Sequence, residues 1–183
     1  MRNEPPLNRE ERLRRAGSVC ANFARNLAYY RATRENNQRR YPRKNIWVTI
    51  EGNFIDAAVL EWCKLFGDAN GRHAWQRVVQ TPDQFEADLL RTIGKTAEEF
   101  EAIRNQVRLY RDRFVAHLDN DRIMHIPNFE PPWEAVQHYF HQIVFVEMNA
   151  QERARGGLTN IRNYYSDCFD ELRKNLIAPV DED

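Results

Sequence analysis

The sequence predicts an all-α protein, a bundle of about six helices. Over long stretches the apolar residues recur at alternating spacings of three and four, which places them on one face of a helix. No segment shows the strict apolar–polar alternation of a half-buried strand, so no sheet is predicted. No repeat of fixed period is present either, which argues against a solenoid.

The composition indicates one globular domain over residues 1–183, with residues 1–7 and 179–183 as flexible tails. Hydrophobic residues make up 42% of the chain and charged residues 30%, which is enough apolar surface for a core. Lys plus Arg and Asp plus Glu each number 27, so the formal net charge is +0. Any binding of nucleic acid must therefore come from a local basic patch.

The sequence contains no signal for export or membrane insertion. Its first residues are charged, and no apolar run approaches the ~20 residues of a membrane span. The three cysteines, Cys20, Cys63 and Cys168, are far apart and form no CxxC pair, which indicates buried free thiols in a reducing compartment. We therefore expect a cytoplasmic protein without membrane partners.

The first two predicted helices are long and apolar on one side. The first runs from about Arg9 to Asn37, with Asn8 as its N-cap. The second covers Ile46–Phe66 and is apolar over so wide an arc that we expect it to be covered on two sides. Gly52 weakens this helix and predicts a close crossing by another helix there. The apolar stripe of the first helix is Leu13, Ala16, Cys20, Phe23, Leu27 and Tyr30.

A basic segment separates these two helices, where Pro42 breaks the helical pattern. It is either a solvated connection or a loop that contacts the phosphates of a substrate. Its candidate substrate-binding residues are Arg39, Arg40, Arg43 and Lys44.

Two helix starts follow in the middle of the chain. Thr81, with Pro82 next and Gln84 at the capping-box position, starts a short helix that Gly94 ends. A long helix then covers Thr96–Asp119, and its capping box is Thr96 with Glu99. Its apolar stripe is Phe100, Ile103, Val107, Tyr110 and Phe114, and His117 takes the next place in the series.

Two further helices complete the bundle, one from near Trp133 and one over about Asn160 to Leu176, with a break at Arg155-Gly156-Gly157 between them. His138 and His141 are three residues apart, which suits a metal pair. No carboxylate or cysteine is placed at ligand spacing on their face of the helix, so we predict no metal and no cofactor.

The long helix carries the residues best suited to chemistry. Arg111, Asp112 and Arg113 lie one to two turns before His117. A histidine that titrates near neutrality beside a fixed cation is suited to acid–base catalysis on a phosphate.

The run RDRFVAHLD, Arg111–Asp119, resembles the Arg-polar-x(n)-His signature of HEPN domains, and it is most similar to the branch related to abortive-infection proteins. HEPN domains are small all-helical proteins of bacterial defence and toxin–antitoxin systems. The resemblance implies a metal-independent endoribonuclease that acts as a homodimer on RNA and has a cognate antitoxin as partner.

The resemblance also implies roles for three residues. Arg111 would hold the phosphate and stabilise the charge that builds on it, because a guanidinium matches phosphate geometry. His117 would act as general base or acid while a ribose 2′-hydroxyl attacks the neighbouring phosphate. Asp112, the polar residue after the arginine, would orient one of them.

Geometry decides how these residues can cooperate. On an ideal helix Arg111 and His117 are roughly 120° apart and ~9 Å along the axis, so one helix cannot bring both to one phosphate. Two copies facing each other across a dimer cleft can. Arg113, four residues before His117, faces the same way and is the second candidate for the phosphate ligand.

Two other interpretations stay open. The chain can be a non-catalytic HEPN-like module that dimerises and binds a partner. It can also be an unrelated helical protein whose Arg/His cluster only forms ion pairs at a helix end. The enzyme needs His117 exposed in a cleft shared with an arginine, whereas the unrelated protein would have His117 sealed in the core of one chain.

Overall fold

The computed structural model describes residues 7–35, 38–41, 44–115 and 125–176, and it confirms the predicted all-α class. The six α-helices of at least 12 residues match the six predicted ones. In chain order the α-helices of the described ranges are α1 (Arg9–Ala32), α2 (Asn45–Trp62), α3 (Trp75–Val78), α4 (Pro82–Ile93), α5 (Ala97–Tyr110), α6 (Glu130–His141), α7 (Ala150–Gly156) and α8 (Ile161–Leu176).

Two other kinds of element accompany these helices. Strands β1 (Arg34–Glu35) and β2 (Gln38–Arg39) form one short antiparallel ladder between α1 and α2. Three α-helices continue into a π-helical turn, in which hydrogen bonds join residues five apart. These turns are Cys63–Gly67 after α2, Arg111–Val115 after α5 and Gln142–Glu147 after α6.

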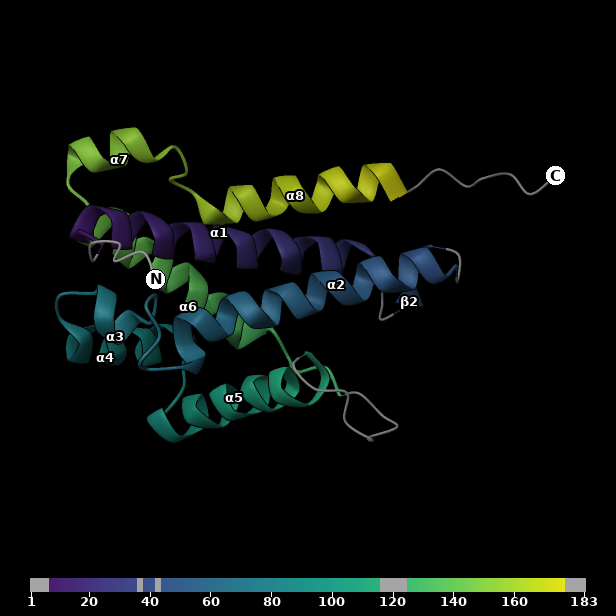
Figure 1. Cartoon of the computed structure of the whole chain (residues 1–183), viewed down its shortest axis with the longest axis horizontal. Coiled ribbons are helices and arrows are strands. Elements are labelled where there is room, and N and C mark those ends of the chain that lie inside the picture. The colour runs from purple at the N-terminus through teal and green to yellow at the C-terminus, as the bar shows by residue number, and fades with distance from the viewer. Residues whose placement is uncertain (1–6, 36–37, 42–43, 116–124, 177–183) are drawn as a thin grey trace, which may run out of the picture.

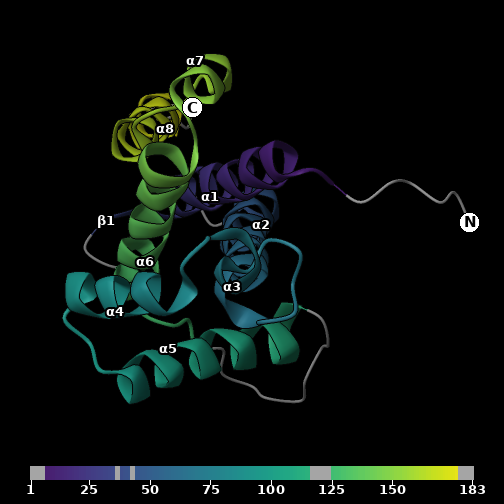
Figure 2. The same ribbon diagram turned by 90° about the vertical axis from the view of Figure 1, so that its left-hand side faces the viewer.

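Helix α1 is the centre of the bundle. It packs between α2 and α8, and the three helices lie side by side (Figure 1). Helix α6 runs across α1, and α4 packs on α6 (Figure 2). Helix α5 lies at the outer edge of the bundle in both views, against the end of α2. None of the described helices is long and apolar enough to cross a membrane.

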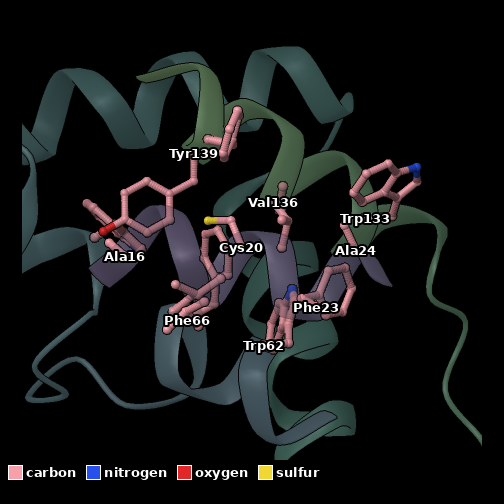
Figure 3. Packing of buried hydrophobic residues seen from close by; sticks show 14 of the residues in the cluster. Ala16, Cys20, Phe23, Ala24, Trp62, Phe66, Trp133, Val136 and Tyr139 are labelled. Carbon is pink, nitrogen blue, oxygen red and sulfur yellow. The ribbon is translucent and has the colours of Figure 1, made fainter. Parts of the chain in front are cut away.

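Small side chains let α6 approach α1 closely. Ala16, Cys20 and Ala24 are spaced by four on α1 and are fully buried. Val136 and Tyr139 of α6 pack over them (Figure 3). Interiors are packed as densely as organic crystals, so larger residues at these α1 positions would push α6 outward.

The polar atoms of two large core aromatics, Trp62 and Tyr139, have partners. The indole Nε1 of Trp62 donates to the carbonyl oxygen of Pro132 at 3.2 Å. The hydroxyl of Tyr139 donates to the carbonyl oxygen of His73 at 3.1 Å. These bonds satisfy groups whose burial would otherwise cost free energy, and they fix α6 against α2 and the segment before α3.

The predicted N-cap at Asn8 and the predicted capping box at Thr96 are confirmed, and Asn8 also forms a full capping box. The Asn8 side chain accepts the Glu11 amide at 2.9 Å, and Thr96 Oγ1 accepts the Glu99 amide at 3.2 Å. In both cases the glutamate returns a bond to the amide of the capping residue. Each pair satisfies two of the backbone donors that a helix start leaves open, which fixes where α1 and α5 begin.

The predicted start of the short helix is right, but its capping box is wrong. Helix α4 begins at Pro82, yet the Thr81 side chain makes no capping hydrogen bond. The side-chain amide of Gln84 instead donates to the carboxylate of Asp88 at 3.0 Å, one turn further on. The end at Gly94 is confirmed, because this residue has φ +61°, a left-handed conformation that favours glycine.

Two helices end earlier than predicted. Helix α1 stops at Ala32 and not at Asn37, because the Thr33 hydroxyl donates to the Tyr30 carbonyl at 2.6 Å and the chain turns into β1. The long helix predicted to reach Asp119 leaves α geometry after Tyr110.

Two predictions for the second helix are corrected. It is covered on two sides only in its second half, where Ile55, Val59 and Trp62 are buried, whereas Ile46 near its start is exposed. A Cβ atom at Gly52 would meet no heavy atom within 4 Å, so no helix crosses closely there.

Two further sequence predictions are confirmed. Cys20, Cys63 and Cys168 are buried free thiols. The break at Arg155-Gly156-Gly157 is the end of α7, with Gly157 at φ +78°.

Candidate functional site

The candidate site lies at the carboxyl end of α5. Arg111, Asp112 and Arg113 lie on the π-helical turn Arg111–Val115 that continues this helix. His117, the predicted acid–base group, belongs to residues 116–124, which are outside the described ranges. The pairing of Arg111 with His117 therefore stays a prediction.

The π-helical turn changes one premise of that pairing. The expected 120° separation assumed an ideal α-helix through position 117, but hydrogen bonds joining residues five apart widen the helix from Arg111 to Val115. Single π turns inside helices are frequent at functional sites. Two other helices of this protein also end in a π turn, so the turn alone does not mark a site.

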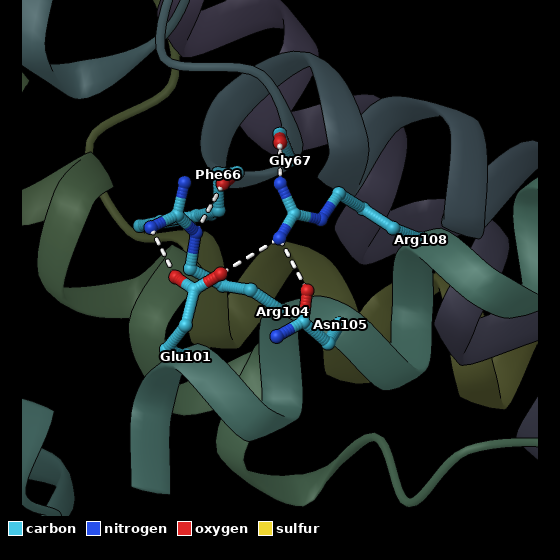
Figure 4. A network of polar contacts seen from close by, with 6 residues as sticks. All are labelled: Phe66, Gly67, Glu101, Arg104, Asn105 and Arg108. Carbon is cyan, nitrogen blue, oxygen red and sulfur yellow. Dashed lines mark hydrogen bonds and ion pairs between the residues drawn. The ribbon is translucent and has the colours of Figure 1, made fainter. Parts of the chain in front are cut away.

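A row of arginines on α5 caps the end of the α2 helix. Arg104 Nε donates to the Phe66 carbonyl at 2.8 Å, and Arg108 Nη1 donates to the Gly67 carbonyl at 3.3 Å (Figure 4). A helix end leaves its last carbonyls without partners and carries partial negative charge, so cations there stabilise it. Arg104 and Arg108 are therefore explained by structure alone.

Glu101 holds both guanidinium groups in place. Its two carboxylate oxygens accept from Arg104 Nη1 and Arg108 Nη2, each at 2.7 Å (Figure 4). Because these side chains are only partly buried, solvent screens the pairs and each contributes modestly to stability. The geometry nevertheless fixes α5 against the π turn Cys63–Gly67.

Arg111 continues this row but binds carboxylates and not backbone carbonyls. Its Nε donates to Asp112 Oδ1 at 2.7 Å, and its Nη1 lies 3.3 Å from Asp68 Oδ2. The Arg111 side chain is 21% exposed, whereas those of Asp68 and Asp112 are 60% and 56% exposed. The hydrogen bond that Arg111 donates to Asp112 raises the pKa of Arg111 above its usual range, so the group is always a cation.

The Arg111–Asp112–Asp68 cluster can hold an anion only after a rearrangement. Two carboxylates beside Arg111 repel an approaching phosphate. The contact with Asp68 is the longer one and comes from a separate segment, whereas Asp112 is the adjacent residue. A phosphate can therefore replace Asp68 on the outer edge of the guanidinium while Asp112 keeps its orientation.

The thiol next to this cluster is not a nucleophile. Burial raises the pKa of Cys63 to about 11, although the charge of Arg111 acts in the opposite direction. Burial also raises the pKa values of Cys20 and Cys168. Cysteine attacks as the thiolate, so none of the three is suited to covalent catalysis near neutral pH.

Arg113 faces a different neighbourhood from Arg111. It is exposed and lines a hollow of about 370 Å³ with Leu109, Phe114 and residues 125–128. The ring of Phe114 packs on Tyr110, with centroids 5.5 Å apart. The two candidate phosphate ligands are thus not brought to one point within this chain.

Part of the predicted substrate loop has a structural role. Glu51 of α2 is 3% exposed and accepts hydrogen bonds from Arg34 Nε at 2.7 Å and Arg39 Nε at 2.9 Å. The buried Tyr41 hydroxyl also donates to this carboxylate. Burial alone would raise the pKa of Glu51, but these three donors outweigh it and the net pKa is lowered.

The other residues of that loop differ in position. Arg40 is partly exposed, Lys44 is exposed at the start of α2, and Arg43 lies outside the described residues. The Arg39 side chain is hydrogen-bonded to Glu51. A contact between phosphate and any of these four basic residues stays a prediction.

Sequence reasoning missed Glu51 and Asp68. Glu51 had a detectable signal, because it is a charged residue four positions before Ile55 on the apolar side of its helix. Asp68 had none, since its contact with Arg111 joins segments 43 residues apart.

The histidine pair on α6 lies far along the chain from this cluster. Glu134, His138 and His141 line one hollow of about 440 Å³. The premise that no carboxylate shares the histidines' face was therefore wrong, because Glu134 is four residues before His138. Burial lowers the pKa of His138, and its Nδ1 lies 3.3 Å from Thr92 Oγ1. Within the described ranges no three His, Cys, Asp or Glu side chains are placed to share a metal ion.

The chain matches no protein-family model, no curated protein and no solved structure, so its function is argued from the residues and the geometry above.

Proposed function

We propose that this chain is a metal-independent endoribonuclease of the HEPN type that acts as a homodimer. RNA is its substrate, and its biological setting is bacterial defence or a toxin–antitoxin pair with a cognate antitoxin. Arg111, Asp112 and His117 form its site, and the Arg111–Asp112–Asp68 cluster is the described part of it.

One observation carries the proposal: the Arg111–Asp112 pair lies on the surface, at the end of a helix on the edge of the bundle. Arg104 and Arg108 bind backbone carbonyls, whereas Arg111 binds two carboxylates that are 60% and 56% exposed. The same edge is open to a second copy, because α5 contacts mainly its own π turn and the end of α2, and Leu109 on it is exposed. This placement supports a cleft shared by two chains.

The chemistry follows from the types of residue. Arg111 holds the scissile phosphate by two parallel N–H bonds after Asp68 has moved aside, and Asp112 keeps the guanidinium in position. The 2′-oxygen attacks phosphorus while a base removes its proton, and the 5′-oxygen leaves with a proton from an acid. His117 of the same or the second copy supplies one of these two functions. The products are a 2′,3′-cyclic phosphate and a 5′-hydroxyl end.

A second candidate is a HEPN-like module that dimerises and binds a partner without catalysis. The hydrogen bonds of Arg111 favour this candidate, because two carboxylates already accept from its guanidinium group. This candidate predicts the same dimer and the same exposed cluster, but no cleavage.

Cleavage of RNA by the purified protein in EDTA separates the two candidates. We expect products with cyclic phosphate ends, and a loss of about 10²-fold or more in rate for His117→Ala and for Arg111→Ala. Matched controls are His141→Ala and Arg91→Ala, which change exposed residues of the same types on α6 and α4. Equal cleavage by wild type and His117→Ala would identify a contaminating nuclease, and no cleavage by folded wild type on any RNA would leave only the module.

A further inference from the structure

The ends of α1 and α5 lie at one end of the bundle (Figure 1), and residues of both line hollows there. The first, of about 370 Å³, lies between the end of α5 and the segment before α6. The second, of about 450 Å³, lies between that segment and the end of α1. Both are lined by Ile126, Pro127 and Asn128, so they lie on the two sides of this segment. We call the two hollows together the end groove.

The α5 side of the end groove has the chemistry of a slot for a flat ring. Leu109, Phe114 and Ile126 provide apolar walls, and the amides of Gln106 and Asn128 lie at its edge. Unpaired nucleobases are bound by stacking on aromatic or apolar side chains, with hydrogen bonds from amides to their edges.

Positive charge follows the groove on both sides of this slot. Arg113 lines the first hollow, and Arg31 and Arg34 line the second. The Arg34 guanidinium carbon is 5.1 Å from the centroid of the Tyr30 ring. Arg31 is paired with Glu130, which also lines the second hollow, and Arg34 shares the single carboxylate of Glu51 with Arg39. Three arginines thus face two carboxylates, and this wall keeps a net positive charge. A chain with formal net charge +0 thus concentrates cations where the slot lies.

We propose that the end groove binds single-stranded RNA, with one base in the slot between Leu109 and Phe114 and the backbone along Arg113, Arg31 and Arg34. This inference rests on the proposed ribonuclease function and specifies its substrate as unpaired RNA. Arg111 lies on the same π turn as Arg113 but contacts Asp68 and Asp112 outside this groove, so binding in the groove is tested apart from cleavage. A base inside a duplex cannot enter the slot.

Binding is measured separately from cleavage, in a His117→Ala background, by fluorescence anisotropy of a labelled 12-nucleotide single-stranded RNA and of the same strand in a duplex. We expect the single strand to bind at least about tenfold more tightly. Leu109→Glu and Phe114→Ala should each weaken binding about tenfold, because the slot is then charged or lacks its stacking ring. Val146→Glu, an exposed apolar residue on the π turn after α6, is the control for Leu109→Glu.

The salt dependence tests the backbone contact. Arg113→Gln should lower the slope of log K against log salt by about 0.7, the value for one phosphate contact on a single strand. Arg91→Gln, an exposed arginine on α4, should leave the slope unchanged.

The outcomes separate this inference from the ribonuclease proposal. If the slot variants lose binding while the controls keep it, the groove is supported. If the wild type in addition cleaves no RNA, the enzyme is refuted. If the wild type cleaves RNA but the slot variants bind RNA like the controls, the groove is overturned and the ribonuclease proposal stands. Equal affinity for single strand and duplex also overturns the groove. Leu109→Glu changes an exposed residue, so it stays informative if Phe114→Ala does not fold.

Discussion

Neutralising Glu51 should destabilise the fold more than any exposed acid of the chain does. Its carboxylate is 3% exposed and accepts bonds from Arg34, Arg39 and the buried Tyr41 hydroxyl. Glu51→Gln keeps the shape but places an amide NH₂ group against donors. Loss of one partner in a buried ion pair costs 3–5 kcal/mol, but both arginines reach water, so we expect about 2 kcal/mol.

Urea unfolding followed by circular dichroism measures this loss, and it corresponds to a fall in Tm of about 4–8 °C for a chain of this length. Glu130→Gln is the control, since that carboxylate is 65% exposed in its pair with Arg31 and should cost less than about 0.5 kcal/mol. If the two variants lose equal stability, Glu51 does not join the β1–β2 ladder to α2 as the structure indicates.

The same carboxylate gives a pH dependence with a defined sign. The pKa of Glu51 is lowered by folding from its ordinary value of 4.5, so the folded state binds this proton less readily than the unfolded state. The contribution of Glu51 to the free energy of unfolding is therefore complete above pH 4.5. It is lost as the pH falls through the lowered pKa. The difference in stability between wild type and Glu51→Gln should be constant at neutral pH and should shrink in acid.

The remaining predictions concern two glycines, a thiol and the carboxylates beside Arg111. Gly52→Ala should stabilise the protein by about 0.5–1 kcal/mol, because the site is helical and open. Gly94→Ala should destabilise it by about 1 kcal/mol, because Gly94 has φ +61°. Thermal unfolding measures both changes. Cys63, with its pKa raised to about 11 by burial, should react with a thiol reagent at pH 8 only after the protein is unfolded. Asp68→Asn should keep or raise the affinity for RNA, whereas Asp112→Asn should lower the rate of cleavage; a fall in affinity with Asp68→Asn would refute the displacement of Asp68 by phosphate.

Local signals predicted much of this fold. The capping boxes at Asn8 and Thr96 and the left-handed Gly94 are set by residues a few positions apart, so the starts of α1 and α5 and the end of α4 were predicted correctly. The end of α1 was not, because the turn into β1 is stabilised by Glu51, which lies 17 residues beyond Arg34. The π turn at Arg111 was missed as well, since apolar spacing does not distinguish it from an α-helix.

The candidate site was predictable in residue type but not in contacts. The run at Arg111–Asp119 predicts a phosphate-binding arginine and an acid–base histidine through its resemblance to the HEPN signature, and these roles stay predictions. The partners that decide what each arginine can do come from distant segments, namely Asp68 for Arg111, Glu51 for Arg39 and Asn128 in the hollow that Arg113 lines.

The most direct test of the central proposal mixes Arg111→Ala and His117→Ala chains in equal amounts, after each has been shown to be folded and inactive on RNA. If Arg111 of one chain acts with His117 of the other, each mixed dimer regains one intact site. Half of a random mixture is mixed dimers, so about a quarter of the wild-type activity should return. A mixture no more active than either variant, beside a wild type that cleaves RNA, would contradict a site shared between two chains.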